Sequence, residues 1–304
     1  MNIPALQNKV TTFFNTTQNE AKRVFHGRGH CYPELEHICI DWFPPLVLIT
    51  AYQPIEDIAA MLSLLMDSDK NEQIESVLLQ HRYQDKSPSE IIHGQLNNSF
   101  IVKAQGLQFE IQPNKHQNSG LFLDVGPLRE WLKHNSKDKN VLNLFAYTCS
   151  LSVAALAGGA KQVTNVDMSK PSISWGQRNH QLNEQNLRQV RSIPHNIFKS
   201  WGKIKRYGLY DTVIIDPPTR QKGSFEATHD YGAVIRKLPK ICNDGAYIIA
   251  GLNSPFHDRQ FLLDTFKAEC PQCQFIEFLP IAEEFEEIDA DRGLKLILYR
   301  YCSI

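Results

Sequence analysis

Residues 141–169 read VLNLFAYTCSLSVAALAGGAKQVTNVDMS, and this stretch decides the fold. VLNLF (141–145) and VTNV (163–166) are short apolar runs of the kind that form buried strands. Between them, LSVAALAGG (151–159) is a helical stretch of small residues that ends at a glycine pair, as helices often do. The stretch therefore predicts a strand–helix–strand unit.

The same alternation continues toward the C-terminus. Two more apolar runs follow at 212–216 and 246–251, and two more helical stretches follow at 172–182 and 257–270. Strands that alternate with helices predict an α/β fold with a doubly wound, Rossmann-like, mostly parallel sheet. QFIEFLP (274–280) and LKLILYRY (294–301) have no helix between them, which predicts a terminal antiparallel hairpin at the sheet edge.

The preceding part of the chain has a different pattern. Strand-like runs at 37–43 and 46–52 are separated by Pro44 and Pro45, and helical spacing extends from Pro54 to Asp67. Shorter strand-like runs follow at 74–79, 100–104 and 107–111. We therefore expect an N-terminal tail or helix over 1–20, a small α+β domain over 21–115 and the Rossmann-like domain over 116–304.

The charge of the chain is nearly balanced, because its 304 residues include 32 Lys and Arg and 33 Asp and Glu. This excludes a polybasic nucleic-acid coat and an acidic tail protein. Residues 1–110 carry a net charge of −5 and residues 111–304 carry +4, so contact with an anionic polymer is expected in the second part. The sequence lacks the long apolar run of a membrane span and the pattern of a secretory signal. Seven cysteines without disulfide-like spacing indicate reduced thiols in the cytoplasm.

The loop from Asn143 to Ser150 follows a strand at the point where a doubly wound sheet binds its ligand. It is neither G-x-G-x-x-G nor a P-loop, and it offers hydroxyls and an aromatic ring where a pyrophosphate would need glycines. Asp167 ends the next strand, where a carboxylate accepts hydrogen bonds from ribose hydroxyls. Alone, the loop is equally compatible with a plain strand–helix turn; together with Asp167 it predicts a site for a nucleoside cofactor.

A second motif, Asp216-Pro217-Pro218-Thr219, directly follows the strand TVIID. Two prolines fix φ and remove two backbone donors, so the loop is stiff and its carbonyls are free to face a substrate. A proline pair can also be a simple turn. Its position beside a nucleoside site favours a catalytic role.

These residues resemble a known family. NLFAYTxS, GGA (158–160), VDMS, WxxRNxxLN (175–183) and DPPT are similar to class I S-adenosylmethionine-dependent methyltransferases that act on bacterial large-subunit rRNA. The resemblance is to the 23S rRNA guanine-N7 and cytosine-C5 methyltransferase group, and it is strongest over 118–255. It implies S-adenosylmethionine as cofactor and RNA, in particular 23S rRNA, as partner.

The resemblance also implies roles for individual residues. The loop would cradle the methionine part of the cofactor, Asp167 would bind ribose, and Met168 would pack on adenine. Asn196 stands where many relatives have an Asp that bonds the adenine amino group. The implied cofactor-binding residues are Asn143, Phe145, Tyr147, Thr148, Ser150, Asp167, Met168, Asn196, Asp216, Phe122, Asp124 and Arg129. The implied catalytic residues are Asp216, Pro217, Pro218 and Thr219, and the implied substrate-binding residues are Arg220, Lys222 and Asn253.

One departure separates the two sister activities. Cytosine-C5 methyltransferases need a cysteine thiolate. In that sister group it follows the strand that corresponds to 246–251, where this chain has Asn253-Ser254-Pro255. We therefore expect methylation of a guanine nitrogen. Methylation of a protein or small molecule, and a non-catalytic cofactor-binding scaffold, remain alternatives.

Four other features have ordinary interpretations. The single Cys270-x-x-Cys273 pair favours core packing. The family resemblance implies that the cluster from His26 to Cys31 lies in a hairpin of the small domain, so no metal is expected. The acidic run Glu283–Asp291 is interpreted as a solvated loop. The basic stretch Arg188–Arg206 is interpreted as a solvated helix face or as a phosphate-contacting rim near the cofactor.

Overall fold

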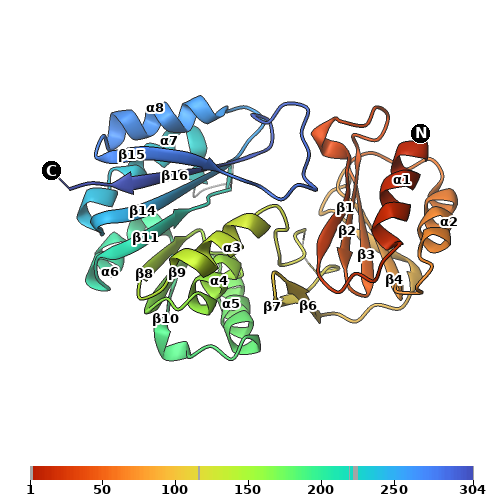
Figure 1. The fold of residues 1–304 in the computed structure, drawn as a ribbon, viewed down its shortest axis with the longest axis horizontal. Coiled ribbons are helices and arrows are strands. Elements are labelled where there is room, and N and C mark those ends of the chain that lie inside the picture. The colour runs from red at the N-terminus through yellow and green to blue at the C-terminus, as the bar shows by residue number, and fades with distance from the viewer. Residues whose placement is uncertain (1–2, 116, 219, 222–224, 304) are drawn as a thin grey trace. The chain divides into compact units, whose positions relative to one another are not determined.

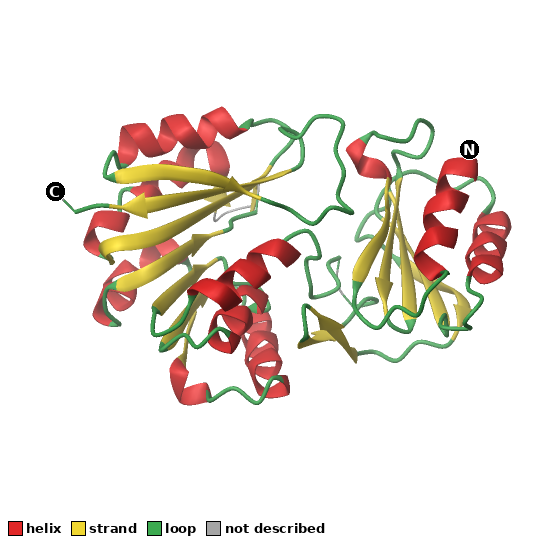
Figure 2. Ribbon diagram, viewed as in Figure 1, coloured by secondary structure: helices red, strands yellow, loops and turns green. Residues whose placement is uncertain are grey.

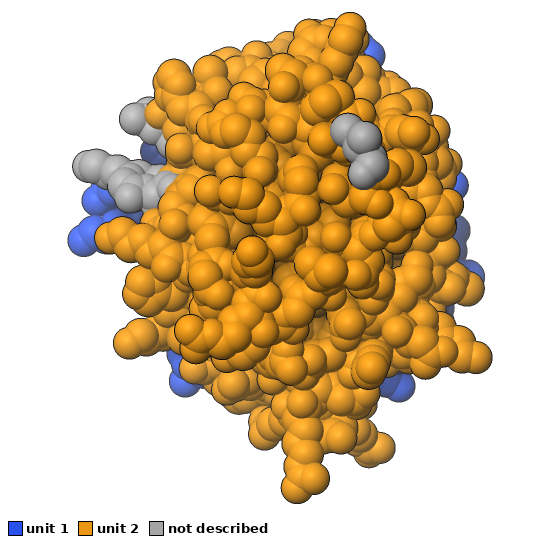
Figure 3. Space-filling model, turned by 90° about the vertical axis from the view of Figure 1, so that its left-hand side faces the viewer, with its two compact units in different colours: residues 1–124, 282–289 blue, residues 125–281, 290–304 orange. Residues whose placement is uncertain are grey.

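A computed structural model describes residues 3–115, 117–218, 220–221 and 225–303 (Figures 1 and 2). The chain divides into two compact units, which Figure 3 colours separately. Unit 1 comprises Met1–Asp124 and Ala282–Asp289, and unit 2 comprises Val125–Ile281 and Ala290–Ile304. This division differs from the expected domain boundary after residue 115, and it assigns one late segment to unit 1.

Unit 1 is built on a five-stranded sheet with the order β1-β2-β3-β4-β5. β3 and β4 are parallel and the other neighbours are antiparallel. A separate antiparallel pair, β6 and β7, completes the strands. Their bounds are β1 Lys22–His26, β2 Ile38–Phe43, β3 Leu46–Ala51, β4 Ser76–His81, β5 Ser89–Gly94, β6 Phe100–Ala104 and β7 Leu107–Ile111.

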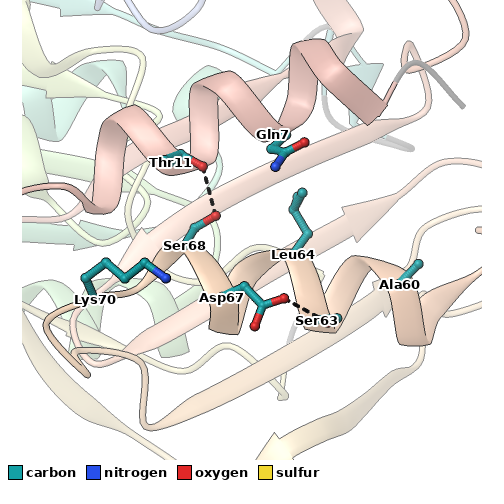
Figure 4. A pocket seen from close by; sticks show the side chains of 8 residues that line it. All are labelled: Gln7, Thr11, Ala60, Ser63, Leu64, Asp67, Ser68 and Lys70. Carbon is teal, nitrogen blue, oxygen red and sulfur yellow. Dashed lines mark hydrogen bonds between the residues drawn. The ribbon is translucent and has the colours of Figure 1, made fainter.

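The first residues of unit 1 form a helix, α1 (Ile3–Phe14). Leu6, Val10 and Phe14 repeat every four residues, lie on one face and are almost completely buried in the core of the unit. α1 lies beside α2 (Ile58–Ser68), and the hydroxyls of Thr11 and Ser68 are hydrogen-bonded at 3.0 Å (Figure 4). A shallow groove between the two helices is lined by Gln7, Thr11, Ala60, Ser63, Leu64, Asp67, Ser68 and Lys70.

The acidic run is a loop with several exposed residues, as expected, but the expectation that solvent alone surrounds its acids is wrong. Glu286 accepts hydrogen bonds from Lys9 Nζ at 2.8 Å and Tyr32 Oη at 2.5 Å. The backbone N–H of Ile288 donates to the carbonyl of Gly29 at 2.8 Å. The segment Ala282–Asp289 is therefore bound into unit 1, because its acids meet cations and hydroxyls that lie far away in the sequence.

Unit 2 contains a seven-stranded sheet with the order β10-β9-β8-β11-β14-β16-β15. The first five strands are parallel, and β16 is antiparallel to both of its neighbours. The predicted doubly wound α/β sheet with a terminal antiparallel hairpin is confirmed. The strands are β8 Asn140–Leu144, β9 Gln162–Asp167, β10 Val190–Pro194, β11 Tyr210–Ile215, β14 Cys242–Asn253, β15 Cys273–Leu279 and β16 Leu294–Tyr301. A short antiparallel pair, β12 (Arg220–Gln221) and β13 (Phe225–Glu226), follows β11.

Helices cover both faces of this sheet (Figures 1 and 2). α4 contacts both α3 and α5, and a large core under α6 to α8 includes Ile204, Val234 and Phe266. The helices are α3 Gly126–Asn135, α4 Ser150–Ala157, α5 Lys170–Leu182, α6 Trp201–Arg206, α7 Ala227–Ile235 and α8 Arg259–Glu269. Cys270 and Cys273 belong to this core, with their sulfurs 3.5 Å apart. No helix among the described residues has the length and apolarity to cross a membrane.

Candidate active site

The loop between β8 and α4 has an unusual backbone. Phe145, Tyr147 and Cys149 have φ values of 59°, 45° and 64°, so three side-chain-bearing residues occupy the left-handed region. Such a conformation costs of the order of 1 kcal/mol or more per residue and persists only where surrounding contacts hold it. The loop thus reaches the tight backbone path that other nucleotide-binding loops obtain with glycine.

Asp167 at the end of β9 provides part of that support. Its Oδ2 accepts the backbone N–H of Tyr147 at 2.9 Å, and its Oδ1 accepts the backbone N–H of Ser169 at 2.8 Å. Burial is the largest influence on this carboxyl and raises its pKa, while the two N–H donors act in the opposite direction. The carboxylate therefore joins the loop after β8 to the turn after β9.

The helix α5 supports the loop from the other side. Asn179 Nδ2 donates to the carbonyl of Thr148 at 2.9 Å. At Gly176, an added Cβ would lie 2.3 Å from the sulfur of Cys149, so only glycine lets the helix approach so closely. Burial raises the pKa of the Cys149 thiol, which keeps it protonated and unreactive at neutral pH.

A buried polar network lies beneath the loop. Asn143 and Asn165 are cross-strand partners, and Asn143 Nδ2 donates to Asn165 Oδ1 at 3.2 Å. Asn165 Nδ2 lies 3.5 Å from His180 Nε2, and His180 Nδ1 lies 2.6 Å from Gln185 Oε1. Gln185 Nε2 donates to the carbonyl of Val153 in α4 at 2.8 Å. The network thus connects β8, β9, α5 and α4, the four elements that surround the loop.

His180 is the titratable member of this network. It is completely buried, and this burial lowers its pKa to about 4. A neutral imidazole can donate from Nδ1 to Gln185 and accept at Nε2 from Ser152 or Asn165. Neutral His180 therefore satisfies the network, and protonation would remove its acceptor.

Asp216 follows β11, next to β8 in the sheet. An added Cβ at Gly251 in β14 would lie 2.6 Å from Asp216 Oδ1, so glycine leaves room for this carboxylate. The hydroxyl of Tyr231 donates to the carbonyls of Gly251 at 2.9 Å and Ile215 at 3.3 Å. Tyr231 is completely buried and fixes the ends of β11 and β14 on which Asp216 depends.

The other residues that the sequence indicated lie at different depths. Met168 is 43% exposed, so its side chain is accessible beside the end of β9. Asn196 follows β10, and its Oδ1 accepts the backbone N–H of Phe198 at 2.9 Å. Phe145 packs edge-on against Phe225 with 5.0 Å between the ring centres. Ser150 begins α4. Three of the predicted residues are buried, namely Asn143, Thr148 and Pro217. Pro218 and Asn253 are exposed.

The structure brings together the loop residues and Asp167, and it places Asn196 and Asp216 at the same carboxyl edge of the sheet. Arg129 is buried in α3 of unit 2, whereas Phe122 and Asp124 belong to unit 1. Thr219 and Lys222 lie outside the described residues, as does the side chain of Arg220. In the described part of the chain, no cluster of His, Cys, Asp and Glu could hold a metal ion.

Sequence reasoning missed the supporting residues Gly176, Asn179, His180, Gln185 and Tyr231. Each acts through a partner that is distant in the sequence, such as Thr148 for Asn179 or Gly251 for Tyr231. The one available signal was an asparagine in each of two predicted buried strands, Asn143 in VLNLF and Asn165 in VTNV. A buried amide needs polar partners, so it points to a network.

Comparisons with known proteins agree with this geometry. A family model described as S-adenosylmethionine-dependent methyltransferase matches residues 22–300. The ribosomal RNA large subunit methyltransferase K/L of Shewanella sediminis is 35% identical over 185 residues, which are 59% of this chain and 26% of that protein. Its counterpart in Hahella chejuensis is 28% identical over 255 residues, which are 75% of this chain and 33% of that protein. The chain thus spans about a quarter to a third of the length of these relatives.

Solved structures share the fold. A methyltransferase crystallised with S-adenosylhomocysteine superimposes with a TM-score of 0.84 at 22% identity, covering 99% of this chain and 82% of that one. The tRNA m1G37 methyltransferase of Methanocaldococcus jannaschii gives 0.62 at 16% identity, covering 89% of this chain and 78% of that one. At these identities the likeness shows the fold alone.

Proposed function

The chain belongs to the S-adenosylmethionine-dependent methyltransferase family, and on this premise we propose that it methylates a base of large-subunit rRNA at a guanine nitrogen. S-adenosylmethionine is the cofactor and supplies an activated methyl group. The rRNA substrate is proposed because the curated relatives are named for it, although this chain spans only part of their length.

The residues present fit the cofactor. Each Asp167 oxygen accepts one backbone N–H in the structure, so lone pairs remain for the two ribose hydroxyls. The first turn of α4 follows Cys149, which provides no side-chain cap, so its backbone N–H groups suit an amino-acid carboxylate. Met168 and Asn196 would meet the adenine. Phe122, Asp124 and Arg129 remain proposed cofactor contacts.

The substrate base would lie at Asp216-Pro217-Pro218. Guanine N7 carries no proton and needs only to be positioned in line with the methyl group. An exocyclic amine would lose a proton, which Asp216 could accept. A target inside an RNA helix would have to be flipped out of its stack to reach this loop.

The cysteines support a nitrogen acceptor over C5 of cytosine. A C5 mechanism needs a thiolate beside the base. Cys149 is buried with a raised pKa, and Cys242 begins β14 at the opposite edge of the sheet from Asp216. Neither cysteine is suited to attack a base that is held at Asp216.

One observation carries the proposal: Asp167, the strained loop and Asp216 follow three adjacent strands, β9, β8 and β11, at one edge. The test is transfer of tritiated methyl groups from S-adenosylmethionine to purified rRNA and to total protein, followed by nucleoside analysis. We expect label in a 23S rRNA guanosine, and at least a tenfold slower transfer by Asp216→Asn. Label in protein, or cofactor binding without any transfer, would instead support one of the two alternatives.

Contacts to the RNA near the base are proposed for Arg220, Lys222 and Asn253. In the sequence, Arg220 and Lys222 follow the proline pair by a few residues, which is why these two cations are proposed to contact phosphates next to the target base. The double substitution Arg220→Ala with Lys222→Ala should weaken RNA binding and lower the log–log salt slope by about 0.7–0.9 per lost phosphate contact. Affinity for S-adenosylhomocysteine should not change. RNA binding that equals the parent's at every salt concentration would remove these residues from the substrate site.

A further inference from the structure

The amino ends of the five parallel strands of unit 2 carry a surplus of positive charge. The segments that lead into them are 136–139, 158–161, 183–189, 203–209 and 236–241, and together they hold ten Lys and Arg but two acidic residues. The segments that leave the same strands at the carboxyl edge hold four Lys and Arg and two acidic residues, over 145–149, 168–170, 195–200, 216–224 and 254–258. The positive surplus is therefore greater at the edge opposite the candidate active site.

This corrects an expectation from the sequence. The stretch Arg188–Arg206 is not one helix face, because it contains β10 between two short 3₁₀ turns, followed by α6. Arg188 precedes β10, and the last turn of α6 leads into β11. Of the six cations in the stretch, only Lys199 follows a strand at the carboxyl edge. The rim near the cofactor is thus much less basic than the sequence suggested.

The cations at the amino edge are available to a partner. Lys161, Arg188, Lys203, Lys205, Arg206 and Lys240 are all exposed. Within the part of the chain that the structure describes, none of these six forms an ion pair, whereas Arg236 pairs with Glu269 at 2.5 Å. We call these six residues the amino-edge patch. Three of them lie in α6, which Figure 1 shows on the left-hand side of unit 2.

Two tyrosines order neighbouring cations at this edge. Lys139 Nζ lies 4.3 Å and Arg300 Cζ 5.1 Å from the ring centre of Tyr247. Arg191 Cζ lies 4.7 Å from the ring centre of Tyr207, and Arg191 Nη1 donates to the carbonyl of Tyr207 at 2.7 Å. Cations stacked on rings are partly fixed before a partner arrives, which lowers the entropic cost of binding.

Helix dipoles explain only part of this charge. Lys203, Lys205 and Arg206 occupy the last turn of α6, where cations slightly stabilise a helix. Lys161 lies in the turn before β9, and Arg188 lies in a 3₁₀ turn. A role in helix stability does not account for their position.

We propose that the amino-edge patch binds the phosphate backbone of the RNA substrate at a distance from the methylated base. The proposal rests on RNA being the substrate. β11 has six residues, so the two edges of the sheet are roughly 20 Å apart. An RNA must therefore be longer than the few nucleotides around the target base to contact both edges. The patch would distinguish a large structured RNA from a short oligonucleotide.

The test uses the full chain with Lys203→Glu, Lys205→Glu and Arg206→Glu combined. The matched control reverses three exposed lysines of unit 1, Lys70, Lys86 and Lys103, and so has the same net charge. Binding to a long 23S rRNA transcript and to a short stem-loop is measured from low to moderate salt. We expect the patch variant to bind the transcript at least tenfold more weakly than the control near 0.1 M salt. Its log–log salt slope should be smaller by about 2–3, because each phosphate contact contributes about 0.7–0.9.

Three comparisons decide the outcome. A neutral variant, Lys203→Gln with Lys205→Gln and Arg206→Gln, should give an intermediate loss with an unchanged melting temperature. Binding of the short stem-loop should change less than twofold. The proposal would be overturned if the patch variant and the control variant bound the transcript equally well. It would also be overturned if the patch variant differed from the control only in having a lower melting temperature. Because binding is measured apart from methyl transfer, failure of the proposed methylation would be recognised separately.

Discussion

The carboxylate of Asp167 accepts the backbone N–H of Tyr147 at 2.9 Å, so the residue proposed to bind ribose also holds the strained loop. The two functions of this side chain should therefore be lost together. Asp167→Ala should weaken S-adenosylhomocysteine binding by roughly 1.5–3 kcal/mol, or about 10- to 150-fold, because charge-assisted hydrogen bonds are removed. Calorimetry measures the change, with Asp264→Ala on the exposed side of α8 as control. Unchanged affinity in Asp167→Ala would contradict the ribose assignment.

Close packing of α5 on the loop leads to a second prediction. Gly176→Ala places a Cβ against the sulfur of Cys149 and should move the loop, at a cost of roughly 1–3 kcal/mol in stability and with weaker cofactor binding. Gly202→Ala in α6 is the matched control, since nothing lies within 4 Å of its added Cβ. That control should be neutral or slightly stabilising. Calorimetry measures the cofactor affinity of both variants, and thermal unfolding measures their stability. If the two variants have the same affinity and stability, the close contact between position 176 and Cys149 does not determine the position of the loop.

His180 should make the stability of unit 2 depend on pH. Its folded pKa of about 4 is below the unfolded value of 6.5, so the unfolded chain binds the proton more tightly. This contribution to stability is complete above pH 6.5 and is lost as the pH falls from 6.5 through 4, by about 3 kcal/mol in total. Three of the four tryptophans, Trp131, Trp175 and Trp201, lie in unit 2, so urea unfolding followed by tryptophan fluorescence reports mainly on it. His180→Gln should flatten the dependence, and an equally steep profile would exclude His180 as its source.

Tyr231 is expected to affect catalysis through the position of Asp216. Tyr231→Phe removes a hydroxyl bonded to the carbonyls of Gly251 and Ile215, and should cost about 1 kcal/mol of stability. We expect kcat to fall several-fold with little change in KM for S-adenosylmethionine. Tyr210→Phe, which loses a comparable buried bond to the carbonyl of Ile204, is the control and should leave kcat near the parent value. If both variants have the same kcat, the hydroxyl of Tyr231 contributes to stability and not to the position of Asp216.

No covalent enzyme–base intermediate should form. This prediction rests on the positions of two cysteines: Cys149 is buried within the loop, and Cys242 lies at the opposite edge of the sheet. RNA that contains 5-fluorocytosine should therefore not trap the enzyme, and denaturing electrophoresis would show free protein alone. A stable adduct would restore the C5 mechanism and remove the preference for guanine.

The sheet and the position of the site could be predicted because both follow from local patterns. β8, β9 and β11 each contain a short run with several apolar residues, and Asp167 and Asp216 lie at the carboxyl ends of β9 and β11. β10 could not be recognised in the same way. It has the sequence VRSIP, and this partly exposed edge strand lies within a basic stretch that looked like a helix face.

The contacts that hold the site could not be predicted because they depend on register and on distant partners. Asn143 stays a predicted cofactor ligand, and the sequence did not show that its pairing with Asn165 across β8 and β9 directs its amide toward the His180 network. The acidic run likewise appeared to be solvated until the fold supplied Lys9 and Tyr32 as its partners. A charge pattern shows that a partner is needed, and only the fold shows where it is.

The late segment of unit 1 also has a consequence for synthesis of the protein. Lys9 and Tyr32 leave the ribosome before any residue of unit 2, but their partner Glu286 is translated more than 160 residues after Asp124. At about 5–20 residues per second, the nascent unit waits roughly 10–30 s for its last segment. Of the two units, unit 1 is therefore the first to leave the ribosome, but it cannot finish folding until Ala282–Asp289 has been translated, and a nascent chain stalled after Asp124 would present unit 1 without that segment.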